Sequence, residues 1–237
     1  MILGLNGIIA GKGTPPSSLL TNLVSVYKAE SNANDSFGTN NGTSQGGLTY
    51  ATGKSGNSFV GNGTNAYISF PDNSWNFTGS MSINIWAYIS SSSTNSVLYS
   101  NYYYSSGGRD YGFLLEHQSN GNLRFYMQTL SNSPVIVSTS YSGKYNSWKM
   151  ITITKLQNGA LRMYVDGVNI STDNTASNIY YNSLNYSSIN AARYLGATYG
   201  YLENNGKTDE IGIWNKVLTP TEITELYNSG SGKFYPY

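Results

Sequence analysis

Paired carboxylates are the first chemistry that the acidic residues could support, because glycoside hydrolysis needs two carboxyl groups about 5–9.5 Å apart across one site. On a β-strand such a pair stands at even spacing on one face. Asp209 and Glu210 are adjacent and therefore point to opposite faces of an expected strand. Glu116 stands alone on its expected strand, and Asp166 falls in an expected turn. The acids predict no catalytic pair, and we expect the protein not to be an enzyme.

Histidine and cysteine chemistry is limited by the numbers of these residues. The chain has one histidine, His117, and no cysteine. Disulfides, thiolate metal sites and cysteine nucleophiles are therefore excluded. We interpret His117 as a polar residue at the end of a strand.

An oxygen-rich loop is expected from residue 30 to residue 42. It gathers carboxylate, amide and backbone oxygens within a few residues, and Ca²⁺ binds six to eight such oxygens. The candidate ligands in this loop are Glu30, Asn32, Asp35 and Asn40. The alternative is an ordinary turn-rich loop held by asparagine side-chain hydrogen bonds. The residues leave both interpretations open.

Tyrosine is abundant, with 22 residues, and many of them fall in expected loops, Tyr180 and Tyr186 among them. A flat ring with a polar hydroxyl suits stacking on sugars and contact with other proteins alike. The alternative is that these rings cover sheet edges or fill the core. The ligand-binding residues that we expect are Tyr102, Tyr103, Tyr104, Arg109, Tyr111, Tyr181, Tyr199 and Tyr201.

An antiparallel β-sandwich is expected to position these residues. The segment from Ser80 to Ile89 alternates polar with apolar residues, which predicts a strand whose second face carries Trp86 and Tyr88. Turn signals at Gly61–Thr64, Ser119–Asn122 and Gln157–Ala160 predict hairpins. The expected core residues are Ile83, Ile85, Phe113, Leu115, Ile151, Ile153, Met163, Val165 and Ile213.

One helix is expected near the end of the chain. Thr219 and Glu222 fit a capping box around Pro220, and Gly230 is expected to end the helix. Many short strands followed by one helix indicate two packed sheets. The fold class is therefore all-β, a two-sheet antiparallel jelly-roll sandwich with one short C-terminal helix.

Composition excludes several classes of protein. The net charge is +1 and 11% of the residues are charged, so nothing supports electrostatic binding of nucleic acid or of an anionic membrane. No run approaches the ~20 apolar residues that a membrane-spanning helix needs. The 39% apolar content argues against disorder, and 237 residues suit one large β domain.

A series of short motifs carries a resemblance to a known family. In chain order they are NANDSFGTNNGT from Asn32, GKSGNSF from Gly53, GTNAYI from Gly63, MSINIW from Met81, WKMITIT from Trp148, LRMYVDG from Leu161 and DEIGIWNKVLT from Asp209. Each motif is weak alone, but their order resembles a LamG-like jelly-roll domain over roughly residues 23 to 228. The resemblance implies a concanavalin A-like sandwich, commonly a carbohydrate- or protein-recognition module. It also implies a structural Ca²⁺ whose ligands include Asp209 of the last strand.

The first 21 residues are expected to form an anchoring arm ahead of the domain of residues 22–237. The arm is apolar and rich in glycine, so it should order against another surface. It has no basic residue before Lys12, which disfavours a cleaved signal peptide. The expected partners of the arm are other virion or surface proteins.

Three classes of function are compatible with these features. They are a virion or surface structural protein, a glycan-binding adhesin and a secreted accessory module. The start Met-Ile-Leu-Gly is similar to that of small LamG proteins encoded by bacteriophages. We expect a non-enzymatic, homo-oligomeric protein of the virion surface (capsid decoration, spike or fibre) that binds host glycans. The alternative is a secreted or cell-surface carbohydrate-binding module.

Overall fold

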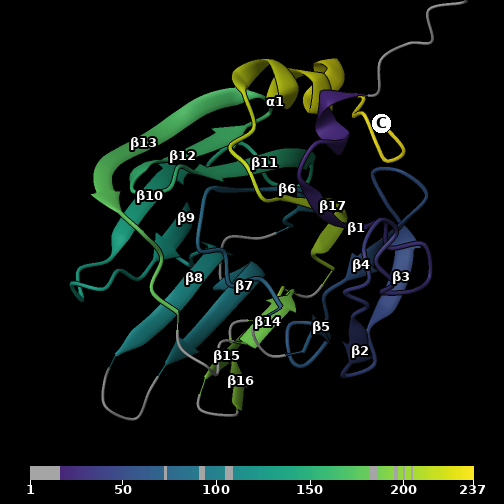
Figure 1. The fold of residues 1–237 in the computed structure, drawn as a ribbon. Helices are drawn as coiled ribbons and strands as arrows, with labels where there is room; N and C mark the ends of the chain where they lie inside the picture. Colours follow the sequence, from purple (N-terminus) through teal and green to yellow (C-terminus); the bar gives the residue numbers. More distant parts are fainter. Residues whose placement is uncertain are drawn as a thin grey trace, which may run out of the picture.

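Two antiparallel sheets pack face to face in the described part of the chain (Figure 1). The computed structural model describes residues 17–71, 74–90, 94–104, 109–181, 186–194, 197–199, 201–203 and 205–237, with the backbone alone at 193, 194 and 197–199. Residues 1–16, which hold most of the expected arm, lie outside the described residues. Helix α1 (Pro220–Tyr227) covers the outer face of one sheet. The expected two-sheet sandwich with one short C-terminal helix is confirmed.

The sheet under α1 contains eight of the described strands and is called the helix-side sheet. In spatial order these are β13 (Val168–Ser177), β12 (Gly159–Val165), β11 (Trp148–Lys155), β6 (Met81–Tyr88), β17 (Lys207–Trp214), β4 (Asn57–Val60) and β3 (Thr49–Thr52), with β1 (Leu23–Tyr27) also paired to β17. The 3-10 turns η1 (Ser18–Leu20) and η2 (Asn228–Gly230) lie near the two ends of the described chain.

The opposite sheet contains seven of the described strands and is called the tyrosine-side sheet. In spatial order these are β10 (Val135–Ser140), β9 (Asn122–Met127), β8 (Asp110–His117), β7 (Ser96–Tyr104), β14 (Tyr186–Ile189), β5 (Tyr67–Ser69) and β2 (Thr43–Gln45). Two short strands, β15 (Ala192–Tyr194) and β16 (Ala197–Tyr199), pair with each other, and β15 lies against β7.

The core lies between the two sheets and is formed by the alternating apolar residues. All nine residues expected there are buried, each at most 5% exposed. The second face of β6 is also covered, because Trp86 is 2% exposed and its ring stacks on that of Tyr227 at a centroid distance of 6.2 Å. The strand from Met81 therefore contributes to two apolar clusters, as its pattern predicts.

Two of the three expected hairpins are confirmed, and one is wrong. β8 pairs with β9 and β11 pairs with β12 across their turns. The turn at Gly61–Thr64 instead carries the chain from one sheet to the other, because β4 belongs to the helix-side sheet and β5 to the tyrosine-side sheet. The amide of Gly61 donates to the carbonyl of Gly206 at 2.8 Å, so this turn bonds to the segment before β17.

Helix α1 begins with the expected capping box. The Thr219 hydroxyl accepts a hydrogen bond from the Glu222 amide at 3.2 Å, and the Glu222 carboxylate accepts one from the Thr219 amide at 2.8 Å. The helix ends earlier than expected, because Asn228 adopts the left-handed conformation with φ of 46°. Asparagine tolerates this conformation and commonly ends helices.

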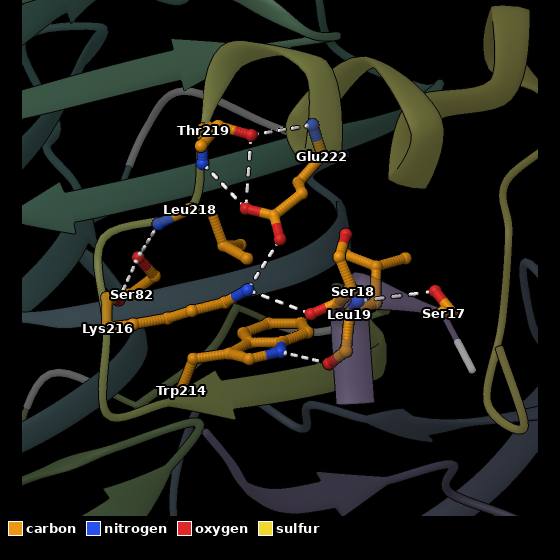
Figure 2. A network of polar contacts seen from close by, with 9 residues as sticks. All are labelled: Ser17, Ser18, Leu19, Ser82, Trp214, Lys216, Leu218, Thr219 and Glu222. Atoms are coloured by element: carbon orange, nitrogen blue, oxygen red, sulfur yellow. Dashed lines mark hydrogen bonds and ion pairs between the residues drawn. The ribbon is translucent and has the colours of Figure 1, made fainter. Parts of the chain in front are cut away.

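A polar network that we call the clasp joins η1, β17 and α1 (Figure 2). Lys216 donates to the carbonyl of Ser18 at 2.9 Å and pairs with the capping residue Glu222. The indole N–H of Trp214 donates to the carbonyl of Leu19 at 2.7 Å, and both side chains are 0% exposed. The clasp therefore places Ser18 to Leu20, assigned by sequence to the arm, within the packed domain.

Candidate functional site

Tyr186, at the start of β14, Tyr199, at the end of β16, and four other tyrosines expected in loops lie in strands instead. Tyr102, Tyr103 and Tyr104 form the end of β7, and Tyr111 stands near the start of β8. The antiparallel register places Tyr103 opposite Tyr111. The loop interpretation failed because tyrosine is also a good strand former, and a run of polar and aromatic residues lacks clear alternation.

These strand ends support a row of four half-buried rings, which we call the tyrosine ladder. Ring centroids are 5.8 Å apart between Tyr186 and Tyr103, 6.0 Å between Tyr103 and Tyr111, and 5.1 Å between Tyr111 and Tyr180. Such spacings are typical of favourable aromatic pairs. The ladder joins strands β14, β7 and β8 to the segment that follows β13.

The segment after β13 brings the last ring into place. The chain leaves the helix-side sheet and crosses to the end of the tyrosine-side sheet (Figure 1). There the amide of Tyr180 donates to the carbonyl of Gln128 at 2.8 Å, and the carbonyl of Tyr180 accepts from the amide of Gly112 at 2.7 Å. These two bonds fix the Tyr180 backbone between β8 and β9. Sequence alone did not indicate this contact, because it depends on the crossover.

Arg109 continues the ladder at the Tyr180 end. Its guanidinium carbon lies 4.3 Å from the ring centroid of Tyr180 and 5.7 Å from that of Tyr111. One of its N–H groups donates to the carbonyl of Leu130 at 2.6 Å. A cation over an aromatic face is attractive, and here it holds the guanidinium beside the rings.

An open pocket of about 570 Å³ adjoins this end of the ladder. Its lining combines hydroxyl, amide and apolar groups, including Thr129, Asn178 and Tyr180. Leu130, on its rim, is 70% exposed. A hollow lined by aromatic and apolar side chains with a few polar groups is the usual form of a small-ligand site.

The remaining residues expected to bind ligand are dispersed. Tyr102 is 7% exposed and packs on the outer face of the tyrosine-side sheet, where Tyr104 lies against the same cluster. Tyr181 packs against the main core, and burial raises the pKa of its hydroxyl. Tyr201 pairs with Tyr67 at 6.0 Å, beyond the far end of β14. The Tyr199 side chain lies outside the described residues.

The acids on β8 are spaced differently from a hydrolytic pair. Glu116 does not stand alone, because β8 begins at Asp110, and both acids face away from the core with Leu114. Six residues of strand separate their Cα atoms by roughly 20 Å at about 3.4 Å per residue. Glycoside hydrolysis needs about 5–9.5 Å between the carboxyl groups. Burial raises the pKa of Glu116, while its partner Arg124, at 2.5 Å, opposes that shift.

His117 is 0% exposed and sits among tyrosines. Its Nε2 is 3.0 Å from the hydroxyl of Tyr145, and its ring makes edge contacts with Tyr141 and Tyr145. Burial lowers its pKa. These contacts account for His117 as a packed residue at the end of β8.

Asp35, a predicted calcium ligand, is held by its own loop. Its Oδ1 accepts hydrogen bonds from the amides of Val26, Phe37 and Gly38 at 2.8–3.1 Å. Its Oδ2 accepts from the amide of Asn40 at 3.2 Å. Four N–H donors meet the acceptor capacity of a carboxylate. Asp35 therefore fits the turn-rich loop interpretation.

Asparagine side chains hold the same loop. The Asn32 amide group donates to the carbonyl of Glu30 at 2.8 Å and accepts from the amide of Asn34 at 2.9 Å. The Asn40 amide group donates to the hydroxyl of Ser25 at 3.1 Å. These are the local hydrogen bonds by which asparagine stabilises turns.

Glu30 and Asp209 lie together on another turn, at Gly53–Asn57. Asp209 accepts from the amides of Lys54 at 2.8 Å and Ser55 at 3.0 Å, and Glu30 accepts from the amide of Asn57 at 3.2 Å. Burial raises the pKa of Asp209 to about 7. Burial and then the charge of Asp209 raise the pKa of the neighbouring Glu210 to about 8.

The predicted calcium ligands thus serve two separate turns. Within the described ranges, no group of three or more His, Cys, Asp or Glu side chains is placed to hold a metal ion. Glu210 Oε1 is a buried oxygen that accepts no hydrogen bond from the described residues. This one oxygen, on the residue next to Asp209, is therefore available as a ligand for a cation. Calcium binding stays a prediction, and loss of thermal stability on chelation, restored by Ca²⁺, would support it.

Comparison with known proteins places the chain in a family. A model described as the concanavalin A-like lectin/glucanases superfamily matches residues 62–224. The chain belongs to this superfamily, and the resemblance seen in its motifs is confirmed. A search of curated protein sequences found no match. None of the helices in the described residues has the length and apolarity needed to cross a membrane.

Solved structures share the fold at low identity. The binding domain of Paraclostridial Mosquitocidal Protein 1 matches with a TM-score of 0.70 and 19% identity over 90% of this chain and 53% of that one. The receptor binding domain of botulinum neurotoxin C/D mosaic serotype matches with a TM-score of 0.69 and 16% identity, over 88% of this chain and 51% of that one. The binding domain of botulinum neurotoxin DC, in complex with SialylT, matches with a TM-score of 0.68 and 19% identity, over 90% of this chain and 52% of that one. The chain spans about half the length of these structures.

Proposed function

We propose that this protein is a non-enzymatic recognition domain that binds glycans through the tyrosine ladder. The observation that carries the proposal is the row of four half-buried rings next to Arg109 and an open pocket. Tyrosine faces stack on the apolar faces of sugar rings, while hydroxyl and guanidinium groups bond to sugar oxygens.

The comparisons support recognition rather than catalysis. The similar solved structures are binding domains, and one was determined in complex with SialylT. Their shared fold does not by itself assign a ligand to this chain. The roughly 20 Å between the Cα atoms of Asp110 and Glu116 also argues against hydrolysis on β8. Incubation with a panel of oligosaccharides should leave them uncut.

A glycan array followed by titration calorimetry tests the ladder. Wild type should bind a set of glycans, and Tyr111→Ala and Tyr180→Ala should each weaken binding roughly tenfold, as expected for loss of one stacking contact of about 1.4 kcal/mol. Tyr201→Ala is the matched control, because it removes one ring of a similar tyrosine pair at a different place. Equal binding by all three variants would remove the ladder from the proposal.

Where the protein is located, on a virion or in a secreted fraction, is a separate proposal. A capsid decoration, spike or fibre of a bacteriophage virion is the role that the sequence favours, with residues 1–16 as the anchor to neighbouring copies or partners. A secreted or cell-surface carbohydrate-binding module is the alternative. Mass spectrometry of purified particles and of secreted fractions distinguishes them. A deletion that tests the anchor should stop at residue 16, because Ser17 caps η1 and Ser18 belongs to the clasp.

A further inference from the structure

Another pocket lies on the outer face of the tyrosine-side sheet, where Tyr102 and Leu114 pack together. Its volume is about 320 Å³. The side chains that matter for its chemistry are Tyr102, Asp110, Leu114, Glu116, Arg124 and Tyr126. Alternation along β8 places Asp110 on this face and Tyr111 on the opposite one. The outer-face pocket is therefore separate from the tyrosine ladder.

Asp110 forms one end of the outer-face pocket and gathers two tyrosine hydroxyls. Tyr102 donates to its Oδ1 at 2.5 Å, and Tyr126 donates to its Oδ2 at 2.6 Å. Gly112 stands between these side chains on β8 and has no side chain to separate them. The Tyr126 hydroxyl also lies 3.3 Å from Gln128 Oε1, so its shorter bond is the one to Asp110. An ionised carboxylate only accepts hydrogen bonds, so Asp110 presents acceptor oxygens to a ligand.

The charges of the outer-face pocket are unequal at its two ends. Glu116 forms an ion pair with Arg124 at 2.5 Å, which leaves that end neutral. Among the ion pairs of the described residues, none includes Asp110. The Asp110 carboxylate is half-buried and has acceptor sites beyond the two used by tyrosine. Among the described side chains that line the pocket, one net negative charge remains, and it is located at Asp110.

We infer that the outer-face pocket binds a primary ammonium group, in the form of a glycan that carries a free amino sugar. This inference rests on the proposed glycan-binding function and adds a ligand class to it. An ammonium group supplies three N–H donors to the acceptor oxygens of Asp110, and it neutralises the Asp110 charge. The rings of Tyr102 and Tyr126, at a centroid distance of 6.3 Å, offer further attraction to a cation. A neutral hydroxyl would supply one donor and leave the charge unbalanced.

The experiment compares two probes, a glucosamine trimer and the same trimer fully N-acetylated, by titration calorimetry. Wild type should bind the amino form at least roughly tenfold more tightly than the acetylated form, because one hydrogen bond to a charged group contributes about that much. Asp110→Asn should remove this preference. Raising the salt to about 0.5 M should weaken binding of the amino form, because salt screens partly exposed charges. Asp173→Asn, which removes an acid from edge strand β13, is the matched control.

Outcomes separate this inference from the ladder proposal. If wild type binds both trimers equally, or does not bind the amino form, the inference is overturned whether or not Asp110→Asn folds. If binding of the amino form depends on Tyr111 and not on Asp110, the ladder proposal is supported and the inference about the outer-face pocket is overturned. If binding of the amino form depends on Asp110 while Tyr111→Ala binds the whole array normally, the outer-face pocket is supported and the ladder proposal is overturned.

Discussion

The two sides of the sandwich carry aromatic residues in different settings. Beneath α1, Trp86 and Trp214 are at most 2% exposed, and the indole N–H of Trp214 bonds to backbone. At the open end of the tyrosine-side sheet, the four ladder rings remain half-buried. A fully covered ring contributes its whole apolar area to folding, whereas a half-covered ring retains a face for a ligand. We infer that the helix side supplies stability and the tyrosine side recognition.

The largest effect is expected from a charge in the core that both sides share. Ile153 is 0% exposed between the sheets. Ile153→Asp should prevent folding, because an unpaired buried charge costs several kcal/mol. Val168→Asp is the control, since Val168 is 63% exposed on β13 of the same sheet. A soluble Ile153→Asp variant with a cooperative thermal transition would place Ile153 outside the core.

Alkaline pH should also unfold the protein, through tyrosines whose hydroxyl pKa is raised by burial. Burial raises the pKa above the usual 10.0 for Tyr27, Tyr99, Tyr141, Tyr181 and Tyr237. Above about pH 10 the unfolded chain releases these protons while the folded chain keeps them. Stability is then full below pH 10 and is lost as the pH rises further. Tyrosinate absorbance should therefore rise together with loss of the circular dichroism signal; a rise with the fold intact would contradict this.

Two alanine substitutions compare the sides directly. Trp214→Ala should lower the free energy of unfolding by about 3–5 kcal/mol, the usual cost of removing a fully buried large aromatic residue. Tyr111→Ala should cost well below that, because its ring is half-buried. Urea denaturation measures both. Equal costs would show that the ladder is chiefly a packing element.

The smallest effect is expected at the helix cap. Thr219→Ala should lower the free energy of unfolding by about 1 kcal/mol, because the Glu222 amide loses its partner. Thr221→Ala, two residues further along and exposed, should change it by less than about 0.5 kcal/mol. The glycan array should not distinguish either variant from wild type. A change in glycan binding would mean that the two sides are coupled.

The sequence predicted those parts of the fold that depend on local pattern. Alternation identified β6, a turn signal between two strand patterns identified the β11–β12 hairpin, and the spacing of Thr219 and Glu222 identified the capping box. The Gly61–Thr64 turn was misread, because turn chemistry does not say which sheet the next strand joins. Strand β13 was missed, because this exposed edge strand is mostly polar and lacks an apolar period.

The candidate site was found in part, by residue type. Tyrosine abundance indicated all four ladder residues but not their contact, because Tyr180 and Tyr186 join Tyr103 and Tyr111 through a crossover and a distant strand. Asp110 was missed because β8 begins earlier than its apolar residues suggest. Side chains from separate strands meet only once the strand order is known, and one sequence does not supply that order.

The clasp has a practical consequence for handling this protein. Leu19 and Tyr237 both contact Trp214, so the two ends of the described chain lie on the α1 side. The ends of β7 and β8 that carry the ladder lie on the far side of the sandwich (Figure 1). A biotin tag at residue 17 or at residue 237 would therefore attach the domain to a sensor chip through its α1 side, opposite the ladder. The ladder rings would then face the solution. A domain attached to a larger assembly through its α1 side would present the ladder outward in the same way.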